Sequence, residues 1–139
     1  MALKIQLLDT ARYSDYVRYP TEEREVALRY RDLTEPVLMR TPTRAGFAGM
    51  KTAAWDDRHA ERDLYDLAGL ARIGALDAES AELFGHATGR RVQPHMFRSL
   101  PARGFDWDSQ LAHQCSSPSS ALECLNEVRA AYGDALGWE

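Results

Sequence analysis

The chain has 139 residues, of which 45% are hydrophobic and 27% charged, values typical of one globular domain with a continuous core. Its formal net charge of −4 excludes a protein that coats nucleic acid through its overall charge, so any such contact must be local. No apolar run approaches the ~18 residues of a membrane span, and the N-terminus lacks a basic-then-apolar signal pattern. We therefore expect a cytoplasmic protein that makes no membrane contact.

Short strands are predicted in the first 42 residues. Leu3–Leu8 starts with alternating apolar and polar residues, as a strand does, and comes almost at once after the first residue. Arg24–Arg31 fits either a strand or a helix by periodicity, and we favour the strand. Pro36–Pro42 is predicted to be extended because prolines bracket it.

The pattern changes to helices at residue 43. Thr43 is a plausible N-cap for a helix that ends near Asp56 and Asp57, and a second helix is expected from about Ala60 to Gly74.

The second half of the chain predicts three more helices. Asp77 is expected to cap the first of them, which precedes the loop at Gly89, and two prolines then punctuate an irregular stretch. The last two helices are predicted over Asp106–Cys115 and Ser119–Tyr132, the final one capped by Ser119 or Ser120 with Gly133 as its stop.

These elements predict an α+β fold. We expect residues 1–42 to be a partial sheet and residues 43–139 to be a mostly helical bundle, the two forming one compact unit. Cys115 and Cys124 lack metal-type spacing and are expected to be reduced thiols, with a disulfide between them left open.

The best candidate site is the run from Lys51 to Leu67, which places basic and acidic residues at helical spacing beside an apolar stripe. On an ideal helix Asp63 and Asp66 share one side at the border of that stripe, so we expect both to be half-buried. Lys51 and Arg58 are seven residues apart and share a face of the preceding helix. If the two helices pack as a hairpin, the charges meet.

Two interpretations of this run remain open. In the structural one, Arg58 and Arg62 neutralise Asp63 and Asp66 and hold the hairpin together. In the functional one, Lys51 faces an anionic substrate while one aspartate binds a metal or polarises a nucleophile. Spacing alone does not choose between them.

A family resemblance extends the functional interpretation. Thr41-Pro-Thr followed by Lys51-x-x-Ala54-x-x-x-Arg58-x-x-x-Arg62-Asp63-Leu-Tyr-Asp66-Leu resembles the C-terminal motifs of the AbiEii/AbiGii nucleotidyltransferase toxins, which include the MenT-type toxins of type IV toxin–antitoxin systems. The resemblance is firm from about residue 41 to 67 and compositional beyond.

The resemblance implies that the early strands belong to a nucleotidyltransferase-like sheet followed by the helical bundle. It implies that Lys51 contacts nucleotide phosphates and that Asp66 or Asp63 completes the catalytic cluster. Arg58 and Arg62 are the further candidates for phosphate binding.

The same family begins with a Gly-Gly-Thr/Ser turn that holds the triphosphate and an Asp-x-Asp strand that binds metal ions. Neither motif is in place here. Asp106-Trp-Asp108 follows the lysine motif and is better explained by helix capping. The resemblance therefore covers the C-terminal portion, and the chain could be an expressed fragment, a split or truncated gene, or a decayed relative.

Two functions follow from this sequence. The leading one is the C-terminal part of an AbiEii-type toxin that contributes Lys51 and the aspartates to nucleotide transfer onto RNA or another acceptor. Mg²⁺ and NTP are expected only in a complete enzyme, and no metal site is predicted in this chain alone.

The alternative function is a non-catalytic module that binds an antitoxin, a complementing N-terminal half or RNA through the basic surface from Arg40 to Arg62. A helical structural domain with an incidental motif is the third interpretation. Under any of them, the edge of the N-terminal strand could pair with another chain or support self-association.

Overall fold

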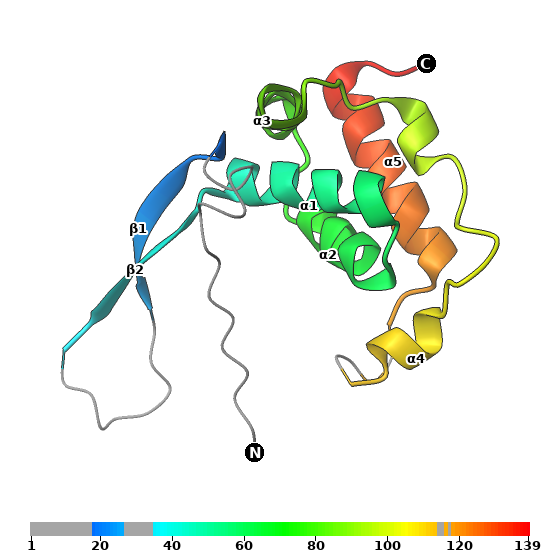
Figure 1. Ribbon diagram of the computed structural model, residues 1–139, viewed down its shortest axis with the longest axis horizontal. Helices are drawn as coiled ribbons and strands as arrows, with labels where there is room; N and C mark the ends of the chain where they lie inside the picture. The colour runs from blue at the N-terminus through cyan, green and yellow to red at the C-terminus, as the bar shows by residue number, and fades with distance from the viewer. Residues whose placement is uncertain (1–17, 27–34, 114–115, 117) are drawn as a thin grey trace.

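The computed structural model describes residues 18–26, 35–113, 116 and 118–139. The strand predicted at residues 3–8 and Cys115 lie outside these ranges. Within them the fold is α+β, as predicted, with two antiparallel strands followed by a helical bundle (Figure 1). The elements are β1 (Thr21–Val26), β2 (Val37–Pro42), α1 (Arg44–Arg58), α2 (Glu61–Arg72), α3 (Ala78–Thr88), the 3-10 helix η2 (Pro94–Phe97), α4 (Trp107–Leu111) and α5 (Ala121–Leu136).

The strands form a two-stranded ribbon that projects from one side of the helices (Figure 1). Thr21 lies opposite Pro42 and Val26 opposite Val37 in its antiparallel register. The extended segment predicted before Pro42 is confirmed. The ambiguous segment from Arg24 is a strand as far as Val26, and this strand begins three residues earlier than predicted. The rest of the segment lies outside the described residues.

The ribbon is joined to the bundle at the start of α1. The backbone N–H of Thr43 donates to the carbonyl of Pro20 at 3.0 Å. Tyr19 is buried, and a Cβ built on Gly49 of α1 would lie 2.9 Å from its ring. The absence of a side chain at Gly49 therefore lets the ring of Tyr19 approach the helix closely.

The first two helices form the predicted hairpin. Thr43 is the N-cap of α1, its hydroxyl accepting from the N–H of Gly46 at 3.0 Å. The helix runs to Arg58, slightly past the predicted end, and stops where His59 takes a left-handed conformation with φ of 50°. Gly74, the predicted stop of α2, also has a positive φ of 70°.

Asp77 caps α3 by accepting from the N–H of Ser80 at 2.8 Å, as predicted. Asp106 likewise caps α4 by accepting from Ser109 at 3.3 Å, which confirms the capping explanation for the Asp-x-Asp triplet. α4 ends at Leu111, four residues before the predicted end.

The predicted end of α5 is wrong. Ser120 is its N-cap, but the helix continues through Gly133 to Leu136, and Gly137 takes the left-handed C-cap with φ of 68°. A glycine inside a helix costs only about 1 kcal/mol relative to alanine. Packing of Leu136 and Trp138 against the core offsets that cost, so Gly133 does not stop the helix.

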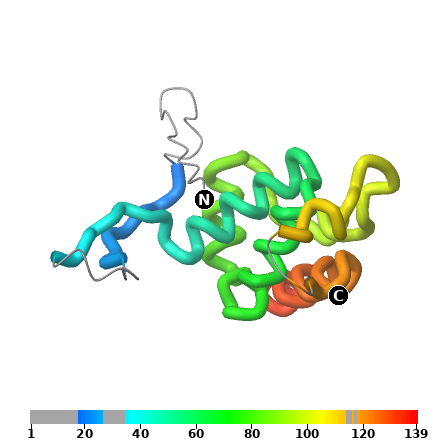
Figure 2. Tube along the Cα trace, turned by 90° about the horizontal axis from the view of Figure 1, so that it is seen from below, coloured from blue at the N-terminus to red at the C-terminus, as the bar shows by residue number. Residues whose placement is uncertain are grey.

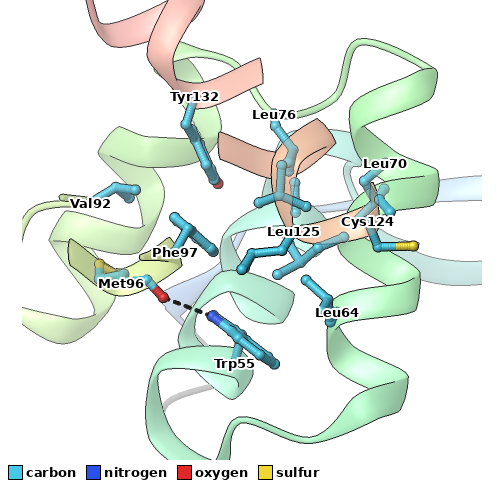
Figure 3. Packing of buried hydrophobic residues seen from close by; sticks show 14 of the residues in the cluster. Trp55, Leu64, Leu70, Leu76, Val92, Met96, Phe97, Cys124, Leu125 and Tyr132 are labelled. Atoms are coloured by element: carbon cyan, nitrogen blue, oxygen red, sulfur yellow. Dashed lines mark hydrogen bonds between the residues drawn. The ribbon is translucent and has the colours of Figure 1, made fainter. Parts of the chain in front are cut away.

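The core lies between α1, α2, α3, η2 and α5 (Figure 3). Trp55 is fully buried at its centre, and its indole N–H donates to the carbonyl of Met96 at 2.9 Å. The hydroxyl of Tyr132 lies 2.7 Å from that of Thr52 and 3.5 Å from that of Ser80, so one polar contact links α5 to α1 and α3. Burial raises the pKa of Tyr132.

Cys124 is a free, buried cysteine in this core, and burial raises the pKa of its thiol. Among the described helices, none is both long and apolar enough to cross a membrane.

Candidate functional site

The α1–α2 hairpin brings four of the five predicted site residues into contact. Lys51 and Arg58 come from the side of α1 that faces α2, and Asp63 and Asp66 come from the first two turns of α2. The short link after Arg58 reverses the chain, so charges 12 to 15 residues apart in sequence meet in space. We call Lys51, Arg58, Asp63 and Asp66 the hairpin cluster.

Asp63 is the centre of the hairpin cluster. Its side chain is 1% exposed, and its carboxylate accepts from Arg58 Nε at 2.6 Å and Nη2 at 3.0 Å. Lys51 Nζ lies 3.4 Å from the same carboxylate. The expectation that Asp63 is half-buried is therefore wrong, because two cations neutralise it and allow full burial.

Asp66 lies one turn further along α2 and is different in character. Its carboxylate is 2.6 Å from Lys51 Nζ, and its side chain is 38% exposed, against 22% for Lys51. The expected half-burial of Asp66 is confirmed. The ammonium of Lys51 also lies 5.6 Å from the ring centroid of Phe47, within cation–π range. Lys51 thus links the buried Asp63 to the solvent-facing Asp66.

Arg62, the fifth predicted residue, lies apart. It is exposed on α2 and forms no ion pair with any residue in the described ranges. The structural interpretation is therefore correct for Arg58 and Asp63 but not for the second pair, in which Lys51 takes the place of Arg62. The side chain of Arg58 is 62% exposed although it forms an ion pair with the buried Asp63.

A cavity of about 520 Å³ opens on the other side of α1. It reaches Arg58, so it adjoins the hairpin cluster. Arg18 and Arg90 also line it, and Asp57 is the acidic residue in its wall. Arg18 donates to the carbonyl of Ala87 at 2.7 Å, and Arg90 forms an ion pair with Asp56. The sequence does not predict this cavity, because its walls come from three separate segments.

The comparisons with known proteins identify a family for most of the chain. A family model described as the nucleotidyl transferase AbiEii toxin of a type IV toxin–antitoxin system matches residues 7–120. The chain belongs to the AbiEii nucleotidyltransferase toxin family. No curated protein and no solved structure matches the chain.

The AbiEii match extends well beyond the segment from residue 41 to 67 on which the resemblance was firm. It spans the ribbon, the hairpin cluster and the helices up to α4, and ends as α5 begins. Membership of a type IV toxin–antitoxin family implies an antitoxin partner.

Lysine usage offers a further signal for the site in this AbiEii chain. Of 17 basic residues counted as Lys or Arg, only Lys4 and Lys51 are lysines. In a chain that otherwise uses arginine, Lys51 places a compact, strongly hydrated point charge between Asp63 and Asp66 of the hairpin cluster. An ion pair that only held the two helices together could use arginine equally well.

The hairpin cluster does not make a metal site by itself. In the parts of the chain that the structure describes, no group of three or more His, Cys, Asp or Glu side chains could hold a metal ion. The carboxylate of Asp63 is occupied by three N–H donors, and Asp66 is the single partly open carboxylate of the cluster.

Proposed function

We propose that Lys51 and Asp66 act in the transfer of a nucleotide onto RNA or another acceptor, in an AbiEii active site completed by a Gly-rich turn and an Asp-x-Asp segment. The observation that carries the proposal is the 2.6 Å contact between Lys51 and Asp66 at the solvent-facing edge of the hairpin cluster. The buried Asp63, which pairs with Arg58, also contacts Lys51 and helps to hold it in place.

Each residue of the cluster has a distinct role in this proposal. Lys51 exchanges Asp66 for a phosphate oxygen of the nucleotide when substrate binds, since an ammonium can move between anions on its flexible stem. Asp66 is then released to polarise the acceptor hydroxyl. Asp63 acts as a positioning residue, because its carboxylate is already saturated, although the family motif made it a catalytic candidate. Arg58 adds a second positive charge for the phosphates, and Arg62 is a weaker candidate for the same role.

The chain is expected to be inactive or nearly so alone. The reaction needs Mg²⁺ and NTP, and the carboxylates that would hold the metal belong to the Asp-x-Asp segment, which has no counterpart ahead of Lys51 in this sequence. A complementing N-terminal half is therefore the partner required for turnover.

The division of the chain into a sheet segment, residues 1–42, and a helical bundle, residues 43–139, remains a prediction.

A specific observation favours a second candidate function, a non-catalytic module that binds an antitoxin, a split partner or RNA. Asp63 has its charge fully satisfied within the hairpin, as an ordinary structural ion pair does. In that case Asp66 would mainly stabilise the fold through Lys51.

The test is a transfer assay from labelled NTPs with Mg²⁺ to bulk tRNA. The chain is assayed alone and then mixed with a fragment that carries the Gly-Gly-Thr and Asp-x-Asp motifs. Transfer is expected only in the mixture. Lys51→Ala and Asp66→Asn are expected to lower it by about 100-fold or more, as loss of a transition-state charge or a general base does. Asp134→Asn, an exposed change on α5, is the matched control and should leave transfer unchanged.

Three outcomes decide between the candidates. Metal-dependent transfer by the chain alone, abolished by Lys51→Ala, would show that no complementing half is needed. A correctly folded chain that stays inactive in the mixture but forms a stable complex with an antitoxin would favour the binding module. Under that second function Asp66→Asn should lower the thermal midpoint and leave complex formation otherwise intact.

A further inference from the structure

β2 exposes three consecutive apolar side chains. Val37, Leu38 and Met39 are 39%, 63% and 52% exposed, and they make up half of the large apolar side chains exposed in the described ranges. Among the described residues, β1 is the only strand that pairs with β2. Within that part of the chain, the second edge of β2 therefore keeps its backbone N–H and C=O groups available for another strand.

The two strands of the ribbon differ in charge. Four of the six residues of β1 are charged, three of them Glu, whereas Arg40 is the single charged residue of β2. Arg40 is neutralised inside the ribbon, because its guanidinium lies 3.6 Å from the carboxylate of Glu23 and donates to the hydroxyl of Thr21 at 3.2 Å. Charged side chains on an edge strand oppose pairing with a further strand. β2 is therefore the edge that favours pairing, and β1 is the edge that opposes it.

The register of the ribbon gathers apolar side chains on one face. Residues directly opposite each other share a face, so Val26, Val37 and Met39 lie on the same side of the ribbon. This face also carries Glu22 and Arg24, which form an ion pair at 2.6 Å and cancel each other's charge. The face is therefore apolar at one end and electrically neutral.

The sequence of β2 is self-complementary across a two-fold axis. Such an axis keeps the same face of both ribbons on one side of a shared sheet, so a residue lies opposite itself or a residue an even number of positions away. Pairing centred on Arg40 would set two guanidinium groups opposite each other, which is unfavourable. Pairing centred on Leu38 or Met39 instead sets Arg40 opposite Pro36 or Leu38 and joins the apolar side chains of both copies.

We propose that β2 pairs antiparallel with β2 of a second copy of this chain, through a two-fold axis at Leu38 or Met39. The shared sheet has four strands, with the apolar β2 strands in the middle and the charged β1 strands at its outer edges. Two strands alone are marginally stable, and four strands with a common apolar face are not. The proposal does not depend on the proposed function.

A second copy fits this edge better than a strand of unrelated sequence. Each copy supplies the same apolar stretch and the same internally neutralised arginine, so the contact is isologous and closes as a dimer. The ribbon projects from one side of the helices (Figures 1 and 2), so β2 can reach a second copy before the two helical bundles meet.

The test is analytical ultracentrifugation of the full chain without NTP or Mg²⁺. A six-residue edge is a small interface, so we expect a weak monomer–dimer equilibrium between about 1 and 500 µM. Met39→Lys should raise the dissociation constant about 10-fold or more, because it places a charge in the middle of the shared apolar face. Leu122→Lys is the matched control on α5, where the apolar side chain is 58% exposed, and should change the constant by less than about 2-fold. Thermal melts of both variants exclude unfolding as the cause.

Oxidative cross-linking tests the strand pairing itself. The chain has two cysteines, so in a Cys115→Ser background the buried Cys124 is the remaining one. Leu38→Cys or Met39→Cys, whichever lies on the axis, should then give a disulfide-linked dimer, because the two introduced cysteines lie directly opposite each other. Glu25→Cys is exposed on the outer strand and should stay monomeric.

Each other outcome overturns the inference. A chain that stays monomeric up to about 500 µM does not pair through β2. Trimers and longer ladders would indicate head-to-tail pairing of β2 with β1, which does not close. Equal weakening by Met39→Lys and Leu122→Lys, or cross-linking through Glu25→Cys, would place the interface elsewhere.

A further outcome would assign the edge to a different partner. If the chain is monomeric but binds the N-terminal fragment of the mixing assay, and Met39→Lys weakens that complex, β2 is the docking edge for the complementing half. None of these outcomes decides whether nucleotide transfer occurs, because the mixing assay measures that separately.

Discussion

Asp63 and Asp66 are three residues apart on one helix, yet their side chains are 1% and 38% exposed. Asp63 lies in the first turn of α2, where the helix dipole favours a carboxylate and where both α1 cations reach it. Asp66 lies one turn on, and among the described residues its ion pair is with Lys51 at the solvent-facing edge. Burial therefore gives two chemically identical residues different surroundings, and the proposed function assigns a positioning role to Asp63 and a reactive one to Asp66.

This division predicts different costs when each charge is removed. Asp63→Asn should lower the free energy of unfolding by about 2 kcal/mol, because it breaks a buried, multiply bonded ion pair. Asp66→Asn should cost less than about 1 kcal/mol, because its pair is partly solvated. Urea unfolding with matched m-values measures both. Equal costs, or a larger cost at Asp66, would contradict the positioning role of Asp63.

At the scale of elements, α1 and α3 approach closely at Gly49. A Cβ there would lie 3.2 Å from the carbonyl oxygen of Ser80 and 3.3 Å from the backbone nitrogen of Phe84. Backbone atoms cannot move aside as a flexible side chain can. The close approach therefore holds α3 against α1 at this point.

Gly49→Ala should therefore lower the free energy of unfolding by about 1–3 kcal/mol through overpacking. Gly69→Ala on α2 is the matched control, since nothing lies within 4 Å of a Cβ built there. That change should raise stability by about 0.5–1 kcal/mol through helix propensity. Thermal or urea unfolding of the two variants measures the difference, and a stabilising Gly49→Ala would show that the helices separate at little cost.

At the scale of the whole molecule, the ribbon and the bundle contribute unequally. Every residue of the described hydrophobic core cluster lies between Ala48 and Trp138. The ribbon instead exposes Val37, Leu38 and Met39. A two-stranded ribbon is at best marginally stable alone, so its attachment at Tyr19 and Thr43 matters more to the ribbon than to the bundle.

Residues 43–139 should therefore fold without the segment before them, which tests the predicted division of the chain. We expect a cooperative thermal transition by circular dichroism, with the free energy of unfolding lowered by about 2–3 kcal/mol for the lost burial of Tyr19. A truncated chain with no cooperative transition would show that residues 1–42 and 43–139 form a single folding unit.

Several features of the fold were predictable because they depend on neighbouring residues. Thr43, Asp77, Asp106 and Ser120 cap helices through side-chain bonds to backbone N–H groups three residues on. The end of α5 was not predictable in this way, because Gly133 stops a helix only if no tertiary packing continues beyond it. The core contacts of Trp138 and Leu136 provide that packing.

The sequence by itself determined the α+β class, the helix starts, the family and the identity of the charged residues in the hairpin. Only the tertiary structure decided that Lys51 and not Arg62 pairs with Asp66, that Asp63 is buried, and that residues 90–106 lie beside the hairpin. The physical reason is range: capping and periodicity act over three or four residues, whereas the partner of a charge depends on how two helices cross and on which face a distant segment covers.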